Sequence, residues 1–400
     1  MMNLKTGTYS INQSWTEGKY TTMSPDKILH IIGGGEIGGA EQHVLNLLEN
    51  LDRKLFLPVL ACLVEGPFAE AARSKGIQTQ TFAMRHPLDL SPLPQLVQWT
   101  RAQNVKLIHC HGARANLLGR LAARFLKIPN LSTVHSSLAH DYLSPFAAWL
   151  ALLLDRLTLP LSNGQIAVSS YLARELAARG SRQVKVIYNG YPVLPPYDHL
   201  QERQEFRRQW NIPFEAQVLG TIARFHPAKG HHTLVEAAKL LQGQFPGLHL
   251  LLIGEGPLKE TIRESLDTLK IPYTLTGFLQ DAYRALPAMD IFILPSIHEG
   301  MGLVLLEAMQ RCTPIVASRT GGIPELVRSE KDGLLVPPGE PEALAHACTR
   351  ILTQPGLAAK LTQSAQDRWP EFSLEVMLKE TQALYTSLLH SPSSGLFPEP

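Results

Sequence analysis

Two glutamates and two cations stand where apolar segments of the chain give way to turns. Glu299 and Glu307 lie eight residues apart in LPSIHEGMGLVLLE, residues 294–307, which begins with the end of the apolar run IFIL. Arg224 and Lys229 lie five residues apart in IARFHPAKG, after another apolar segment. Glycines in both turns allow the chain to enter a helix whose first N–H groups are free to bind an anion. Together these groups suit a ligand that carries both phosphates and hydroxyl groups.

The spacing of Arg224 and Lys229 indicates a binding site for a diphosphate. Arg224 and Lys229 flank a turn that opens a helix, so they can hold a diphosphate from one side. The amides of Leu303 and Val304 can hold it from another side, and Glu307 is one helical turn further on, within reach of hydroxyl groups. The alternative is that the glutamates decorate a helix surface and the cations a solvated loop.

A glycine cluster follows the apolar strand near the start of the chain. Gly33, Gly35 and Gly38 formally satisfy the G-x-G-x-x-G pattern of dinucleotide-binding sites. The acidic residue that such a site needs about 20 positions further on is missing, so NAD is excluded. The turn at Gly38 and Gly39 still allows the backbone to approach a phosphate closely, although a tight turn that needs a positive φ explains it as well.

Apolar segments recur along the chain and alternate with helical stretches. Continuous apolar strands between helices are typical of a doubly wound parallel sheet, which binds ligands beyond the carboxyl ends of its strands. His109, His111 and His135 fall at such ends, where a histidine can also be only a packing group. Besides the strands that begin near residues 27, 58, 217 and 250, we expect strands at 77–84, 105–112, 130–136, 165–170, 184–190, 273–278, 291–296, 313–318 and 334–338.

Length and composition restrict the number of domains and the class of partner. The 400 residues are too many for one ordinary core and suit two domains of roughly 150–200 residues each. Three prolines in YPVLPPYD, residues 191–198, indicate a linker. A net charge of +2 gives no case for nucleic acid as a partner. The four cysteines stand singly, without metal-ligand spacing, and indicate buried thiols in a reducing compartment.

Three features bear on a membrane. Residues 1–200 carry 19 Lys and Arg against 13 Asp and Glu, which fits an anionic acceptor, a membrane surface or only a solvated face. Residues 141–162 contain the most apolar helix, which we expect to lie in the core beneath the sheet rather than on a membrane. Its run FAAWLALLL is too short to span a bilayer, and the polar first 25 residues lack the apolar segment of a secretory signal.

The motifs taken together resemble the retaining GT-B glycosyltransferases of group 1, or glycosyltransferase family 4. The spacing of Glu299 and Glu307 resembles the family's E-x7-E signature, with Met301 where the family usually has an aromatic residue. ARFHPAKG resembles its G-R-x4-K-G element, with Ala223 in place of the first glycine. TVHSS is similar to its T-x-H motif, and SRTGGIPELV to its GG-x-x-E turn, in which Glu325 would cap or orient the following helix.

The resemblance assigns roles to individual residues. The catalytic residues would be Glu299, His135, Arg224 and Lys229. Within the donor site, the strand end TGF would hold the nucleotide base and Glu307 the ribose. The expected donor-binding residues are Gly38, Gly39, Gly277, Phe278, Gly300, Met301, Gly302, Leu303, Val304 and Glu307, and the candidate acceptor residues are His111, Arg114 and Asn116.

The resemblance also implies an α/β fold of the GT-B type. Two Rossmann-like domains with doubly wound parallel sheets would face each other across a cleft, and a C-terminal helix would cross back to the first domain. We therefore expect an N-terminal tail at 1–25, an acceptor-binding domain at 26–192 plus 375–390, a linker at 193–205, a donor-binding domain at 206–374 and a C-terminal tail at 391–400.

The implied activity is transfer of a sugar from a nucleotide-diphospho-sugar to an acceptor hydroxyl, with retention of configuration, in bacterial polysaccharide, lipopolysaccharide or lipid-linked glycan synthesis. No metal cofactor is expected, because the protein cations would stabilise the diphosphate and the chain has no Asp-x-Asp motif. The expected partners are a nucleotide sugar and a glycan or lipid-linked acceptor. The expected location is cytoplasmic, with contact with the inner face of the membrane left open. The alternatives are a nucleotide-sugar-binding protein without transferase activity and a UDP-sugar epimerase on the same architecture.

Overall fold

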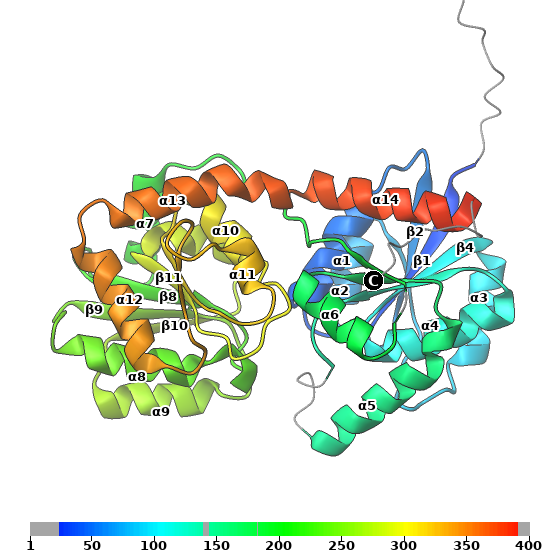
Figure 1. The fold of residues 1–400 in the computed structure, drawn as a ribbon, viewed down its shortest axis with the longest axis horizontal. Helices are drawn as coiled ribbons and strands as arrows, with labels where there is room; N and C mark the ends of the chain where they lie inside the picture. Colours follow the sequence, from blue (N-terminus) through cyan, green and yellow to red (C-terminus); the bar gives the residue numbers. More distant parts are fainter. Residues whose placement is uncertain (1–23, 139–143, 182, 391–400) are drawn as a thin grey trace, which may run out of the picture.

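The computed structural model describes residues 24–138, 144–181 and 183–390. The tails expected at 1–25 and 391–400 lie outside these residues, apart from Ser24 and Pro25. Two parallel sheets organise the chain, one of seven strands and one of six, each forming the centre of a separate domain (Figure 1).

The first domain has the strand order β3-β2-β1-β4-β5-β6-β7, with all neighbours parallel. The central strands are buried from end to end, since helices cover both faces of the sheet (Figure 1). The strands are β1 (Asp26–Ile32), β2 (Phe56–Cys62), β3 (Gln78–Thr81), β4 (Val105–His111), β5 (Asn130–Val134), β6 (Gln165–Ala167) and β7 (Val184–Val186). The helices are α1 (Gly39–Asn50), α2 (Pro67–Ser74), α3 (Leu93–Ala102), α4 (Ala113–Leu126), α5 (Pro145–Thr158), the 3-10 helix η1 (Leu159–Leu161) and α6 (Ser170–Ala178).

The second domain has the order β10-β9-β8-β11-β12-β13, again fully parallel. Its strands are β8 (Gln217–Ile222), β9 (Leu248–Ile253), β10 (Tyr273–Gly277), β11 (Ile291–Leu294), β12 (Ile315–Ser318) and β13 (Leu334–Val336). Its helices are α7 (His199–Gln209), η2 (Pro227–Lys229), α8 (His231–Gln242), α9 (Lys259–Leu269), η3 (Ala282–Ala288), α10 (Val304–Gln310), α11 (Ile323–Leu326), α12 (Pro341–Thr353), α13 (Leu357–Arg368) and η4 (Trp369–Phe372). The predicted fold of two Rossmann-like domains is confirmed.

The C-terminal helix α14 (Leu374–His390) joins the two domains. It starts beside the second domain and runs along the first (Figure 1). Its Tyr385 is fully buried and packs edge-on against Phe56 of β2, with the ring centroids 5.5 Å apart. Tyr191, just after β7, forms a backbone bridge with Ser373 at the start of this helix. The predicted return of the last helix to the first domain is therefore confirmed.

Helix α5 corrects one expectation about the core. The predicted helix at 141–162 was expected to lie beneath the sheet, but α5 turns its large apolar side chains to solvent. Phe146, Trp149 and Leu157 are 69%, 57% and 66% exposed. The inner side of the helix instead buries Asp155, whose carboxylate accepts a 2.7 Å hydrogen bond from buried Arg120 on α4. An ion pair therefore replaces the expected apolar packing.

No helix in the described ranges combines the length and hydropathy needed to cross a bilayer.

Candidate functional site

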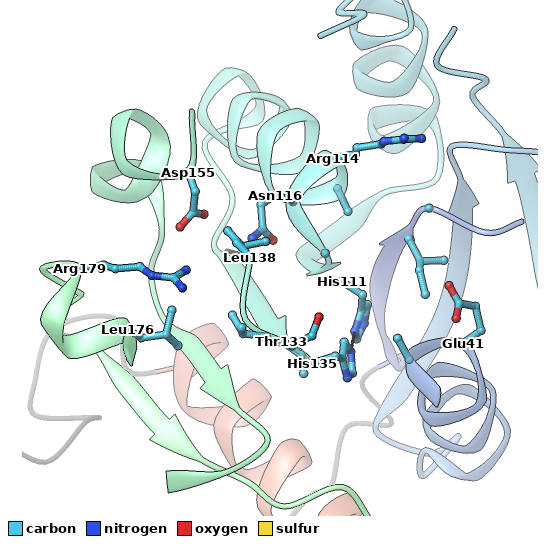
Figure 2. A pocket seen from close by; sticks show the side chains of 18 residues that line it. Glu41, His111, Arg114, Asn116, Thr133, His135, Leu138, Asp155, Leu176 and Arg179 are labelled. Atoms are coloured by element: carbon cyan, nitrogen blue, oxygen red, sulfur yellow. Dashed lines mark hydrogen bonds between the residues drawn. The ribbon is translucent and has the colours of Figure 1, made fainter. Parts of the chain in front are cut away.

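A pocket of about 240 Å³ opens in the first domain at the carboxyl ends of β1, β4 and β5. It contains all three candidate acceptor residues, His111, Arg114 and Asn116, together with His135 (Figure 2). The parallel order of β1, β4 and β5 explains this, because the turns after neighbouring parallel strands meet at one edge of a sheet. Sequence reasoning had given no role to Glu41 in this pocket.

The histidines of this pocket are neutral at physiological pH. Desolvation by burial lowers the pKa of His135 well below its ordinary value, and the charge of His43 lowers it further. The same two kinds of cause lower the pKa of His111. His111 Nδ1 and His135 Nε2 lie 3.2 Å apart, and their rings are nearly parallel. His111 and His135 thus contribute uncharged imidazoles, which can donate or accept a hydrogen bond, to a pocket that Glu41, Arg114 and Arg179 also line.

The glycine turn lies at the rim of the same domain. Gly38 is the N-cap of α1, and its N–H donates to the carboxylate of Glu41 in a 3.1 Å hydrogen bond. A Cβ at Gly39 would meet nothing within 4 Å, so the turn borders open space. Burial raises the pKa of Glu41, while the charge of Arg224 in the other domain opposes this shift. Arg224 therefore acts electrostatically across the space between the domains.

The second domain places Lys229 and Glu299 in direct contact. Lys229 Nζ donates to Glu299 Oε2 at 2.7 Å, and Ser296 Oγ donates to the same oxygen at 3.1 Å. Both charged side chains are mainly buried, with 26% and 12% of their surfaces exposed. The two residues come from turns 70 positions apart that follow the neighbouring strands β8 and β11.

Backbone contacts hold these two turns together. Ile297 N–H donates to the Ala228 carbonyl at 2.8 Å. Gly230, at φ +65°, packs against the Pro295 carbonyl so closely that a Cβ there would collide with it. A Cβ at Gly321, at φ +55°, would likewise collide with the Glu299 carbonyl. Gly230 thus lets the Lys229 turn pack on the turn after β11, and Gly321 of the GG-x-x-E motif packs directly on the Glu299 backbone.

Arg224 lies two residues beyond β8 and is exposed. Burial lowers the pKa of His226, and the charges of Arg224 and Lys229 lower it further. Both cations therefore act on one site, at the turn that carries His226. The structure brings Arg224, Lys229 and Glu299 to the same edge of the second sheet.

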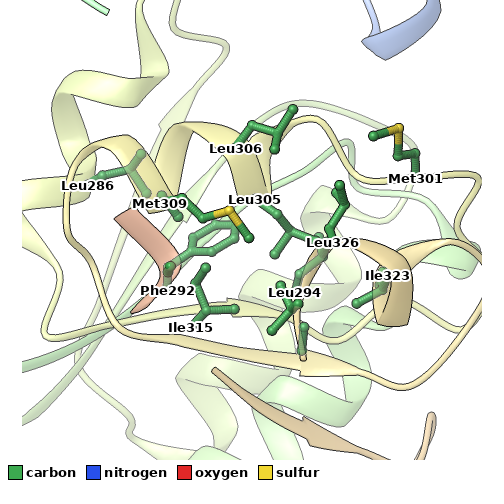
Figure 3. Packing of buried hydrophobic residues seen from close by; sticks show 14 of the residues in the cluster. Leu286, Phe292, Leu294, Met301, Leu305, Leu306, Met309, Ile315, Ile323 and Leu326 are labelled. Carbon is green, nitrogen blue, oxygen red and sulfur yellow. The ribbon is translucent and has the colours of Figure 1, made fainter. Parts of the chain in front are cut away.

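Helix α10 begins at Val304, with Leu303 as its N-cap and Gly302 at φ +83°. The first backbone hydrogen bond into the helix runs from Leu305 N–H to the Gly302 carbonyl, at 3.0 Å. The apolar side of the helix packs on the core of the second domain, formed in part by Phe292, Leu294 and Leu305 (Figure 3). This packing fixes the position of the Glu299 turn above β11. Leu303 and Val304 are partly buried against the same core.

Met301 and Gly300 lie where the second domain meets the first. A Cβ at Gly300 would collide with the His135 carbonyl, so this turn touches the end of β5. Met301 is 2% exposed, and its sulfur accepts a 3.1 Å hydrogen bond from Asn189 N–H. Its side chain therefore packs between the domains, and only its backbone remains for a ligand.

Glu307 faces the segment between the domains. Burial raises the pKa of its carboxyl to about 7, although a hydrogen bond from Tyr191 and the charge of Arg311 oppose this shift. Tyr191 belongs to the Pro-rich stretch that was read only as a linker. No sequence pattern connected it with Glu307, since the two residues meet only when the domains are packed.

The last predicted donor element is the end of β10. Gly277 adopts φ +76°, and a Cβ there would approach the Glu255 carboxylate at 2.7 Å. The following residue, Phe278, is 58% exposed, so its ring presents a free apolar surface next to the strand end. An aromatic face of this kind can stack on a nucleobase.

Glu325 corrects a second expectation. It was expected to cap or orient the helix that follows it, but its carboxylate caps α6 of the other domain. Oε2 accepts from Ser170 N–H at 2.7 Å and Oε1 from Tyr171 N–H at 2.8 Å. Tyr188 Oη donates to the same carboxylate at 3.0 Å. The negative charge at the N-terminus of α6 is favourable, and it ties the two domains together.

Two family models match the chain on the two sides of the linker. Residues 37–193 match the model described as Glycosyltransferase Family 4. Residues 202–368 match the model described as Glycosyl transferases group 1. The two matches lie in the order of the two Rossmann-like domains and together cover most of the described residues.

Similar curated proteins carry glycosyltransferase names. One from Escherichia coli, UDP-Gal:alpha-D-GlcNAc-diphosphoundecaprenol alpha-1,3-galactosyltransferase, is 25% identical over 83% of this chain and 89% of its own length. The putative glycosyltransferase EpsD of Bacillus subtilis is 25% identical over 76% and 82%. A D-inositol 3-phosphate glycosyltransferase of Corynebacterium jeikeium is 26% identical over 89% and 93%.

Solved structures show the same fold. HepE of Anabaena, solved in complex with UDP-glucose, superposes with a TM-score of 0.80 at 23% identity, over 90% of this chain and 99% of that one. Sucrose-phosphate synthase of Thermosynechococcus elongatus gives 0.76 at 24% identity, over 91% and 99%. With the paired domains and the crossing helix α14, these matches show that the chain belongs to the group 1, or family 4, glycosyltransferases and has the GT-B fold.

Proposed function

We propose that this protein transfers a sugar from a nucleotide-diphospho-sugar to an acceptor hydroxyl, with retention of configuration and without a metal ion. The observation that carries the proposal is the contact between Lys229 and Glu299 beside Arg224 at the edge of the second sheet. The names of two similar proteins support the choice of donor, because the E. coli relative is named for UDP-Gal and HepE was solved with UDP-glucose.

The cations would act on the leaving group. As the bond between sugar and diphosphate stretches, negative charge grows on the diphosphate oxygens, and preorganised positive groups stabilise it. Arg224 is exposed for this role, and the Lys229 ammonium has three donors, so it can hold Glu299 and a phosphate oxygen together. Protein cations of this kind can replace a divalent ion, which is why we propose independence from metal.

The remaining donor contacts would orient the nucleotide and the sugar. Glu307 is proposed to accept hydrogen bonds from the ribose, and Phe278 to stack on the base. Glu299 and His135 are proposed to contact the sugar, since Gly300 brings the Glu299 turn against the end of β5. A retaining hydrolase would use one carboxylate as a nucleophile. Glu299 is instead paired with Lys229 and Ser296, which suits a group that binds hydroxyls. The departing diphosphate would accept the proton of the acceptor on the same face.

The acceptor is proposed to bind in the first-domain pocket, with His111, Asn116 and Arg114 as its contacts. Asn116 is buried, and its Oδ1 has no hydrogen-bond partner among the described residues, so it is available to a hydroxyl donor. We propose a lipid-linked acceptor in bacterial polysaccharide or lipopolysaccharide synthesis.

The outer face of α5 supports membrane contact by the same domain. Phe146 and Trp149 stack with their ring centroids 6.0 Å apart, and Leu157 continues the apolar stripe two turns further on. Exposed Arg156 lies beside the stripe. We expect Phe146→Ser with Trp149→Ser to abolish sedimentation with phosphatidylglycerol vesicles, while Phe214→Ser, at an exposed site in the second domain, leaves it intact. Equal sedimentation of both variants would refute the contact.

A panel of nucleotide sugars tests the proposed function. The true donor should raise the Tm of the protein by mass action, and the same donor should support transfer in the presence of EDTA. Stabilisation without transfer or donor hydrolysis would instead indicate a binding protein. Loss of activity with EDTA and its recovery with Mn²⁺ would contradict metal independence.

A further inference from the structure

Five histidines gather behind the first-domain pocket, from four different elements. They are His30 of β1, His43 of α1, His109 and His111 of β4, and His135 after β5. His111 lies at the centre, with its Nε2 3.2 Å from His30 Nδ1 and its Nδ1 3.2 Å from His135 Nε2. The ring of His43 meets that of His135 edge-on, with the centroids 4.7 Å apart. The proposed sugar transfer uses only His111 and His135 of these five histidines.

Two of the possible triads place their ring nitrogens within 4.8 Å of one another. The triad of His30, His109 and His111 is already committed, because His109 uses both nitrogens. Its Nδ1 lies 2.6 Å from Tyr385 Oη and its Nε2 2.7 Å from Thr133 Oγ1. The triad of His43, His111 and His135 differs, because the hydrogen bonds of His111 run to other histidines, His30 and His135, rather than to a hydroxyl. His43 Nδ1 is buried without a hydrogen-bond partner among the described residues.

We propose that His43, His111 and His135 form a binding site for a divalent transition metal ion of the zinc class. Zinc accepts three histidines and one open position in a tetrahedral arrangement. Two nitrogens at about 2.0–2.1 Å from a tetrahedral zinc lie roughly 3.3 Å apart. His111 Nδ1 and His135 Nε2 are already at 3.2 Å, so the ion requires little movement of these two rings.

The surroundings of the triad suit such an ion. With Nδ1 of His111 on the metal, its Nε2–H would donate to His30 Nδ1, the kind of outer hydrogen bond that orients a metal-binding histidine. His111 and His135 line the pocket, which provides both an entry path and the open fourth position (Figure 2).

The metal would oppose transfer rather than assist it. This consequence rests on the proposed function, in which His135 contacts the donor sugar. An ion that holds His135 and His111 would remove both rings from their substrate contacts. It would not replace the diphosphate clamp, since Arg224 and Lys229 belong to the other domain. We therefore expect micromolar zinc to inhibit the enzyme and EDTA to leave its activity unchanged or higher.

Cobalt(II) provides a direct test, because its visible absorption distinguishes a tetrahedral nitrogen site from ions bound loosely at the surface. Titration of the full-length protein should give one equivalent with intense visible bands, which zinc removes. His43→Gln should weaken binding at least tenfold. His346→Gln, at an exposed histidine of α12 in the second domain, is the matched control and should titrate like the wild type.

Two further measurements keep the test decisive. If His43→Gln does not fold, judged by its thermal melt, His135→Gln replaces it, because that ring is only partly buried. Unchanged cobalt spectra in the folded variant, or only weak octahedral bands in the wild type, would overturn the site. The spectra do not depend on catalysis, so failure of the proposed transferase activity would leave this result intact and distinguishable.

Discussion

The two sides of the cleft are built from different kinds of polar group. On the first domain, the histidines of the pocket are kept neutral by burial. On the second domain, the charged groups Lys229 and Glu299 are held in place by each other and by backbone contacts of their turns. Both sides sit at the carboxyl ends of parallel strands, so the same architecture places neutral imidazoles on one domain and an ion pair on the other.

This difference indicates how labour is divided between the domains. A diphosphate needs fixed positive charge, which costs little when a carboxylate such as Glu299 already orients the ammonium. An acceptor hydroxyl needs neutral partners that will not compete for the anion. Under the proposed function, the cations of the second domain would determine where the diphosphate binds, and the neutral histidines of the first domain would not attract it.

The largest predicted effect is the loss of kcat when the Lys229 ammonium is removed. Lys229→Ala takes away one preorganised positive group, which typically lowers kcat by about 10²–10³. Lys239→Ala is the control, because it removes the same single positive charge from an exposed site on the following helix. It should have almost no effect on kcat. Steady-state kinetics on both variants, with circular dichroism to check folding, give the comparison. Wild-type turnover of Lys229→Ala would refute the charged donor side.

The junction of the two sides can be broken at Gly300. A Cβ there collides with the His135 carbonyl, so Gly300→Ala must push the Glu299 turn away from β5. Displacement of a packed backbone costs about 1–3 kcal/mol, which corresponds to a loss of roughly 5- to 150-fold in kcat/KM. Gly243→Ala is the control, since its φ is −69° and a Cβ there meets nothing within 4 Å. Equal kinetics for the two variants would show that the two sides do not need this contact.

The contact of Glu325 with α6 tests whether interactions outside the site also hold the two domains together. Glu325→Gln removes the charge that caps α6, so we expect a loss of about 1–2 kcal/mol in the free energy of unfolding. Glu342→Gln removes a first-turn charge from α12 within the second domain and serves as the control. Urea denaturation measures both. If Glu325→Gln unfolds like the wild type, the cap contributes nothing to holding the domains together.

Much of the fold could be read from the sequence because the strands are continuous apolar segments. The turn residues Lys229 and Glu299 were also accessible, since residues that follow neighbouring parallel strands meet at one edge. In both cases the relevant contact lies within one domain and follows from a rule about sheets.

The contacts that escaped prediction depend on how whole elements are rotated and packed. Helix α5 is apolar on nearly every side, so periodicity could not show that Asp155 would face inward to meet Arg120. Glu325 reaches a helix that is about 155 residues away in sequence and lies in the other domain. His43 was invisible for the same reason, because only the rotation of α1 brings it against His135.

The smallest predicted effect is a pH dependence of donor affinity, which would come from the carboxyl of Glu307. Its pKa is raised from 4.5 to about 7, so without a ligand it is largely protonated below pH 7. Ribose hydroxyls would donate to the ionised form, and donor affinity should therefore rise as pH passes through 7. Between pH 6.5 and 7.5 the ionised fraction increases about threefold, which sets the size of the effect.

Glu307→Gln isolates this contribution from every other titrating group. Calorimetric titration with the nucleotide sugar identified from the panel should show a roughly threefold rise in donor affinity between pH 6.5 and 7.5 for the wild type. The affinity of the variant should be the same at both pH values. A parallel pH profile for both proteins would mean that the dependence arises at another titrating group. In that case the charged side of the cleft would keep its clamp but lose Glu307 as the ribose contact.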